Sequence, residues 1–145
     1  MVVADFKQKL VFIDTAPLIY FIEGNSIYQN VLTQFFLAND AGEFPLITST
    51  ITLLEVLVKP IKANEFEIVE LYKNILTKSS GIETIKINNA VAIKAAEIRA
   101  KYNLKTPDAI QIATAIENSA DYFFTNDERL KNIEEITVLS LKDIL

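Results

Sequence analysis

The sequence predicts an α/β fold, a three-layer α/β/α sandwich around a mainly parallel sheet of about five strands. Two observations lead to this prediction. Short apolar runs alternate along the chain with longer segments whose apolar residues recur at helical spacing. The first apolar run, Leu10–Ile13, ends directly at an acid, Asp14, a pattern typical of a buried strand with a polar group at its carboxyl end.

Length and composition predict one globular domain over residues 1–145. Half of the residues are apolar and 23% are charged, which excludes a disordered chain. No apolar run approaches the ~18 residues of a membrane span, and the apolar run near the N-terminus is too short for a signal peptide. The chain contains no cysteine, which suits a reducing compartment. We therefore expect a cytoplasmic protein with no membrane partner.

Apolar runs, helix-capping residues and turn residues predict the positions of the strands and helices. Strands are expected at residues 10–13, 44–48, 82–87, 122–125 and 136–140. Helices are expected at residues 16–25, 26–40, 50–60, 64–81, 88–104, 105–120 and 127–133. Asn64 and Glu67 are expected to form a capping pair. The best-defined helix start has Thr106 as N-cap, Pro107 as first residue and Asp108 as second.

Histidine is absent as well as cysteine, and this excludes several chemistries. The chain cannot contain a Ser-His-Asp triad, an imidazole general base or a histidine-ligated zinc ion. A metal site must be built mainly from oxygen ligands, which suits Mg²⁺ or Mn²⁺. The net charge of −5 argues against a surface built for general nucleic-acid binding, but clustered catalytic acids would themselves lower the net charge of a nuclease.

Four acids are predicted at one edge of the sheet. Asp14 and Asp127 follow strands, Asp108 begins the helix that leads into strand 122–125, and Glu55 lies about one turn into the helix after the second strand. Carboxylates placed together repel one another unless a cation joins them. A divalent cation lowers the pKa of a bound water, so this cluster predicts hydrolysis without histidine.

Each acid also has a purely structural explanation. Asp14 and Asp127 could cap helices, and Asp108 could complement a helix dipole. Helix capping does not explain Glu55, which stands between Leu54 and Val56 inside a helix. The functional interpretation therefore depends on all four acids converging.

Several segments together resemble the PIN-domain proteins and are similar to the VapC-type ribonuclease toxins. These segments are FIDTAPLIYFIEGN, TLLEVLVKP, AAEIRAKYNLKTPDAIQIATA and DYFFTNDERL. The resemblance implies a parallel sheet flanked by helices, a Mg²⁺ or Mn²⁺ cofactor and endonucleolytic cleavage of RNA. The acidic positions of the family fall on Asp14, Glu55, Asp108 and Asp127, and Thr125 matches a hydroxyl residue that could orient carboxylates or water. The resemblance also implies a homodimer and a cognate antitoxin that binds near the site.

Basic residues lie beside two of the acids. Arg99, Lys101 and Lys105 precede Asp108, and Arg129 and Lys131 follow Asp127. Arg99, Lys105 and Arg129 are candidate contacts for RNA phosphates, although solvated helix faces explain each of them equally well. So few basic residues favour recognition of a particular RNA shape.

Three alternatives compete with a nuclease. A haloacid-dehalogenase-like phosphatase needs a second aspartate where Ala16 stands, and a phospho-receiver domain needs an acidic pair at its first strand and a later lysine. The third alternative is a catalytically idle PIN fold that acts as a binding module for nucleic acid or protein. The four acids favour the enzyme over the binding module.

Overall fold

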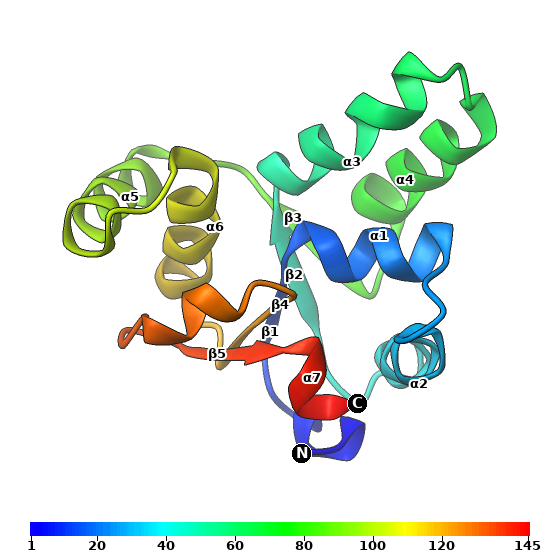
Figure 1. Ribbon diagram of the computed structural model, residues 1–145, viewed down its shortest axis with the longest axis horizontal. Helices are drawn as coiled ribbons and strands as arrows, with labels where there is room; N and C mark the ends of the chain where they lie inside the picture. Colours follow the sequence, from blue (N-terminus) through cyan, green and yellow to red (C-terminus); the bar gives the residue numbers. More distant parts are fainter.

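The computed structural model describes residues 1–145 and has a parallel five-stranded sheet between two layers of helices (Figure 1). The strands are β1 (Val11–Ile13), β2 (Leu46–Ser49), β3 (Ile82–Ile85), β4 (Tyr122–Thr125) and β5 (Thr137–Ser140). Their order is β3-β2-β1-β4-β5, and every neighbouring pair is parallel. The predicted fold class is therefore confirmed, and all five carboxyl ends share one edge.

The helices divide between the two faces of the sheet. They are η1 (Val3–Phe6), α1 (Thr15–Glu23), α2 (Gln29–Asp40), α3 (Thr50–Lys62), α4 (Phe66–Lys78), α5 (Asn89–Tyr102), α6 (Thr106–Glu117), η2 (Glu128–Asn132) and α7 (Leu141–Ile144), where η denotes a 3₁₀ helix. One apolar core joins the sheet to η1, α1–α4 and α7, and a second joins it to α5, α6 and η2. Figure 1 shows these two layers on opposite sides of the strands.

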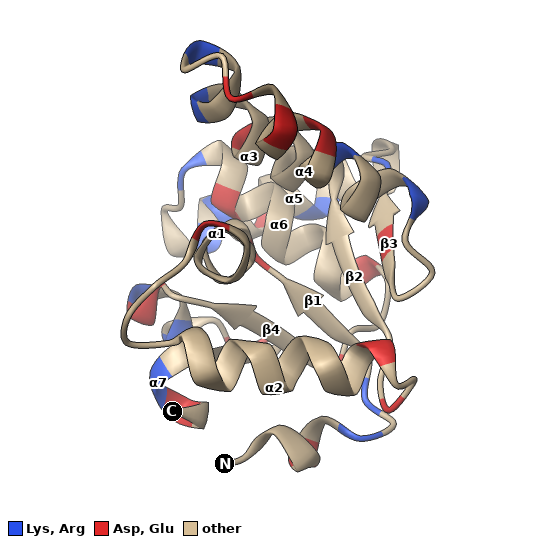
Figure 2. Ribbon diagram, turned by 90° about the vertical axis from the view of Figure 1, so that its right-hand side faces the viewer, with Lys and Arg blue, Asp and Glu red and all other residues tan.

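Successive side chains along a strand point to opposite faces of the sheet, so each strand contributes to both apolar cores. In β1, Val11 and Ile13 point into the first core and Phe12 points into the second. All three side chains are fully buried, because a central parallel strand is covered on both faces. Figure 2 shows that the strands carry few charged residues, in keeping with their interior positions.

The first core contains an aromatic cluster around Phe6 of η1. The ring centroid of Phe6 lies 5.3 Å from that of Phe35, 5.6 Å from Phe44, 5.7 Å from Tyr122 and 6.0 Å from Phe124. Such tilted and edge-to-face pairs are favourable arrangements for aromatic rings. The N-terminal segment is therefore an integral part of the core.

Some helix boundaries differ from prediction. Helix α3 passes through the buried Pro60 and ends at Lys62 instead of near Pro60. The predicted capping pair is wrong, because Asn64 adopts a left-handed conformation with φ of 57° and Glu65 stands at the N-cap of α4. Helix α6 begins one residue early, at Thr106, with Lys105 at the N-cap.

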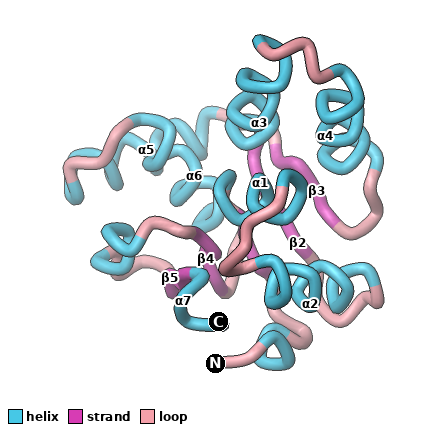
Figure 3. The backbone as a smooth tube through the Cα atoms, turned by 45° about the vertical axis from the view of Figure 1, so that its right-hand side comes forward, coloured by secondary structure: helices cyan, strands magenta, loops and turns pink.

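Helices α3 and α4 form an antiparallel pair that projects from the sheet (Figure 3). Several large apolar side chains on this pair are exposed to solvent. They are Leu54, Val58, Ile61, Phe66 and Leu71. No helix is long and apolar enough to span a membrane.

Candidate functional site

The four predicted acids lie around the carboxyl edge of the sheet. Asp14 follows β1 and caps α1, and its Oδ1 accepts a hydrogen bond from the Thr15 amide. Glu55 stands in α3, and Asp108 lies in the first turn of α6. Asp127 follows β4 and caps η2. Asp14 and Asp127 thus do cap helices, as the structural explanation expects. Both also lie at the same edge of the sheet as the other two acids.

Asp14 is the most enclosed of the four carboxylates. Its Oδ1 accepts from the Thr15 amide at 2.8 Å and from Gln111 Nε2 at 3.3 Å, and its Oδ2 accepts from Thr125 Oγ1 at 2.8 Å. No lysine or arginine pairs with it. Burial raises the pKa of Asp14, the three hydrogen bonds lower it by less, and the negative charge of Asp108 adds to the increase.

Thr125 connects two of the acids. Its hydroxyl donates to Asp14 Oδ2 and accepts from the Asp127 amide at 3.1 Å. Because Thr125 ends β4 beside β1, the sheet itself fixes this distance. The structure thus gives Thr125 the geometry expected of a residue that orients carboxylates.

Gln111 is a site residue that sequence reasoning missed. Its buried side chain donates to Asp14 Oδ1 and to Thr52 Oγ1 at 2.7 Å, and its Oε1 accepts from the Ser49 hydroxyl. The available signal was a lone amide among apolar residues, one helical turn after Asp108 and hence on the same face of α6.

Glu55 reaches the site through a hydroxyl bridge. Its exposed side chain accepts a hydrogen bond from Thr15 Oγ1 at 2.8 Å, and Thr15 is the residue directly after Asp14. Thr15 therefore donates to both acids, to Asp14 from its amide and to Glu55 from its hydroxyl.

Asp108 and Asp127 line a common pocket of about 260 Å³, together with Lys105 and Arg129. Burial raises the pKa of Asp108, and the negative charge of Asp127 raises it further. Hydrogen bonds from Arg129 lower the pKa of Asp127. The pKa values of the two acids are therefore shifted in opposite directions although both acids line one pocket.

The candidate phosphate contacts divide between two places. Lys105 and Arg129 line the pocket beside the acids, whereas Arg99 lines a separate groove between α5 and α6. Arg99 Nε also donates to the carbonyl oxygen of Leu104 at 3.0 Å. The structure therefore brings only Lys105 and Arg129 next to the acids.

The donor set suits Mg²⁺ or Mn²⁺ in its chemistry. Only oxygen ligands are present, and Asp14, Glu55 and Asp108 form no ion pair with any lysine or arginine. No three of the acids come close enough to hold one ion together. Mg²⁺ binds readily through one or two carboxylates and keeps several waters, so the observed pairs of acids fit such an ion.

The Gln111 network leads to a first prediction. Gln111→Leu removes the amide from Asp14 and leaves the hydroxyls of Ser49 and Thr52 without this partner. Removal of a group that orients a metal ligand typically lowers activity or metal affinity by about 10–100-fold. We expect Gln111→Leu to lower both by about this factor. Mn²⁺ titration and RNA cleavage should both show it. The exposed Gln34→Leu in α2 is the control, and equal values for the two variants would exclude the positioning role.

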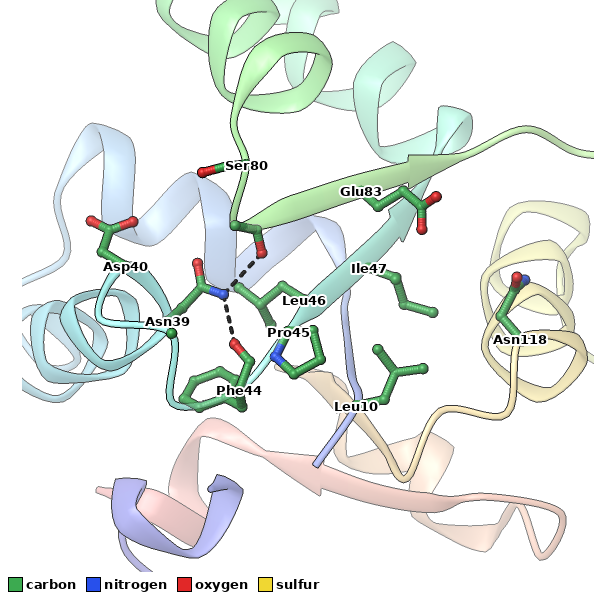
Figure 4. A pocket seen from close by; sticks show the side chains of 12 residues that line it. Leu10, Asn39, Asp40, Phe44, Pro45, Leu46, Ile47, Ser80, Glu83 and Asn118 are labelled. Atoms are coloured by element: carbon green, nitrogen blue, oxygen red, sulfur yellow. Dashed lines mark hydrogen bonds between the residues drawn. The ribbon is translucent and has the colours of Figure 1, made fainter. Parts of the chain in front are cut away.

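A cleft of about 490 Å³ lies at the opposite edge of the sheet, away from the acids (Figure 4). Its buried polar residue is Asn39, whose Nδ2 donates to the carbonyl oxygens of Phe44 and Gly81, both at 2.9 Å. A Cβ atom added to Gly81 would lie 2.6 Å from Asn39 Oδ1. Asn39 thus ties α2 to the starts of β2 and β3, which is a structural role.

Comparison with known proteins identifies the family of the chain and supports its fold. A family model described as PIN domain matches residues 11–136. A comparison with curated proteins finds no match.

Several solved structures share the fold. A chain of the VapBC2 complex of Rickettsia felis, bound to a promoter DNA fragment, superposes with a TM-score of 0.69 at 16% identity and covers 90% of this chain and 98% of that one. A chain of the DNA-bound VapBC of Salmonella typhimurium gives 0.68 at 19% identity, with 92% and 99% covered. VapC20 of Mycobacterium tuberculosis, a toxin that cleaves the sarcin-ricin loop, gives 0.65 at 12% identity, with 78% and 86% covered.

Proposed function

The chain belongs to the PIN domain family, and on that premise we propose that it is a Mg²⁺- or Mn²⁺-dependent endoribonuclease, the toxin of a toxin-antitoxin pair. One observation carries the proposal above the others. Asp14, a partly buried carboxylate with no cationic partner, stands at the same edge of the sheet as three further acids. An arrangement of this kind is costly without a bound cation, and perturbed acids often mark active sites.

The proposed cation ligands are Asp14, Glu55, Asp108 and Asp127, of which no more than two would hold the same ion. A divalent cation held by two of these acids would supply a water of lowered pKa and stabilise the charge that develops on a phosphate. Thr15, Thr125 and Gln111 hold the carboxylate of Asp14 in place. Lys105, which lines the pocket beside Asp108, is suited to contact a phosphate of the RNA.

The proposed partners are an antitoxin protein and a second copy of the chain. The neighbours from Rickettsia felis and Salmonella typhimurium are VapBC complexes. In this chain Leu54, beside Glu55, is 59% exposed, and Phe66 on α4 is 69% exposed. Exposed apolar residues grouped on one helical pair are typical of protein-binding surfaces. A partner that covers Leu54 would lie close to Glu55, the next residue of α3.

A catalytically idle PIN fold that only binds nucleic acid or protein is the second candidate. Its best support is that each of Asp14 and Asp127 already has a capping role. The absence of any such role for Glu55, and the lack of an ion pair at Asp14 and at Asp108, favour the enzyme.

The test is cleavage of RNA by the purified chain. We expect cleavage in Mn²⁺ or Mg²⁺, none in excess EDTA, and a rise in melting temperature when Mn²⁺ is added, because an ion that binds only the folded state stabilises it. Asp108→Asn should lose cleavage, whereas the exposed Glu67→Gln on α4 should cleave like the parent. Cleavage that persists in EDTA, or an RNA complex that forms without cleavage in either metal, would refute the proposed enzyme.

A further inference from the structure

Arg129 occupies both carboxylate oxygens of Asp127. Its Nε donates to Oδ1 at 3.0 Å and its Nη2 donates to Oδ2 at 2.8 Å, while its backbone amide also donates to Oδ1 at 3.0 Å. The planar guanidinium fork thus occupies both oxygens of the carboxylate, which are the atoms that would hold a cation. Asp127 is the only one of the four acids that is paired in this way.

A divalent cation held by the carboxylate of Asp127 would have to compete with this guanidinium. We propose that Arg129 is a built-in counter-ion, which a divalent cation displaces from Asp127 and which then becomes free to bind a phosphate of the RNA. The inference rests on the proposed metal-dependent cleavage of RNA and assigns a role to a residue beside that site.

The structure gives the displacement a small cost. The Arg129 side chain is 82% exposed and makes no hydrogen bond except those to Asp127, so its release breaks no packing. Asp127 itself stays oriented, because its backbone amide donates to Thr125 Oγ1 and its carboxylate still caps η2 through the Arg129 amide. Only the guanidinium has to move.

The released guanidinium would remain next to the chemistry. It lines the pocket that Asp108, Asp127 and Lys105 also line, and its positive charge already acts on Asp108. Arginine binds phosphate oxygens with the same bidentate geometry that it uses for a carboxylate. Arg129 could therefore move from the carboxylate of Asp127 to a phosphate of the RNA and form the same kind of bidentate contact.

The experiment measures Mn²⁺ affinity without RNA, by calorimetry, for the full chain and its variants. Arg129→Gln should bind Mn²⁺ about fivefold more tightly than the parent, a gain of the size that an exposed ion pair supplies. Lys105→Gln is the matched control. It removes one positive charge from the same pocket but breaks no hydrogen bond to an acid, so its gain should be clearly smaller.

A double-mutant cycle separates competition from general charge effects. In the Asp127→Asn background, Arg129→Gln should bring no more gain than Lys105→Gln does, because the contested carboxylate is gone. Equal gains for Arg129→Gln and Lys105→Gln in the parent, or an unchanged affinity in Arg129→Gln, would overturn the inference while leaving the metal site intact. No Mn²⁺ binding by any variant would overturn both the inference and the proposed cofactor.

A second measurement tests the phosphate role. At saturating Mn²⁺, Arg129→Gln should show a KM for RNA that is raised severalfold with little change in kcat, although less Mn²⁺ is needed for half-maximal rate. A higher KM for RNA together with a lower Mn²⁺ requirement is expected only if Arg129 leaves Asp127 and binds the RNA. A purely structural ion pair would not change the two quantities in opposite directions. An unaltered KM would overturn the phosphate role.

Discussion

Replacement of Asp14 by asparagine is expected to lower RNA cleavage by at least about 10³-fold, since a bound cation supplies several kcal/mol of transition-state stabilisation and each 1.4 kcal/mol is worth tenfold in rate. The amide is nearly the same size as the carboxylate and can still accept from the Thr15 amide, so the fold should persist. Single-turnover cleavage in Mn²⁺ measures the loss. Asp40→Asn, at an exposed position of α2, should cleave like the parent, and cleavage by Asp14→Asn at a parental rate would place the site elsewhere.

The same variant should be more stable than the parent when no metal is present. Burial raises the pKa of Asp14 in the folded protein, so the folded state binds this proton more tightly than the unfolded state does. The stability that this carboxyl contributes is therefore fully present below its ordinary pKa of 3.8 and is lost as the pH rises through the folded pKa. Asparagine has no such loss. The melting temperature of Asp14→Asn in EDTA should exceed that of the parent at neutral pH, and the difference should shrink toward pH 3.8.

The second large effect concerns stability alone. Phe6→Ala should lower the free energy of unfolding by about 3–5 kcal/mol, the usual cost of removing a buried phenyl ring from a core. Phe6 is fully buried against four aromatic rings, although it precedes residue 11, where the match to the family model begins. Urea unfolding gives the measurement. Phe66→Ala, the same change at a 69% exposed position, should cost less than about 0.5 kcal/mol.

An equal cost for the two phenylalanine variants would show that the N-terminal segment does not belong to the folding unit. The cleavage activity of Phe6→Ala offers a further comparison. Because Phe6 takes part in none of the hydrogen bonds of the site, any protein that remains folded should retain the parental rate.

Much of the architecture was predictable because the signals are local. Strand β1 is an apolar run that stops at Asp14, and strand β4 is a similar run that leads to Asp127. In a parallel sheet, such endings can lie only at one edge. The order of the strands and the division of helices between two faces were not readable, because they depend on packing between distant segments.

The contacts inside the site were the least predictable part. Gln111 meets Asp14 only because α6 packs against β2 and β4, the strands on either side of β1, and a single sequence contains no record of that contact. Arg129 and Asp127 are only two residues apart. The sequence nevertheless does not specify whether the exposed Arg129 side chain points toward Asp127 and forms an ion pair with it. Local capping rules also failed at Asn64, where the left-handed end of the α3–α4 connection outweighed a favourable capping pattern.

The pairing of β1 with β4 has a consequence for synthesis on the ribosome. Asp14 and Thr125, which share a hydrogen bond, are 111 residues apart in the chain. A nascent chain exposes Asp14 early but cannot lock its carboxylate until β4 and the preceding helix α6 have been made. Folds that depend on such distant contacts also form slowly. Incomplete translation products that end before Thr125 should therefore lack the site, and the proposed activity should arise only after Thr125 has been made.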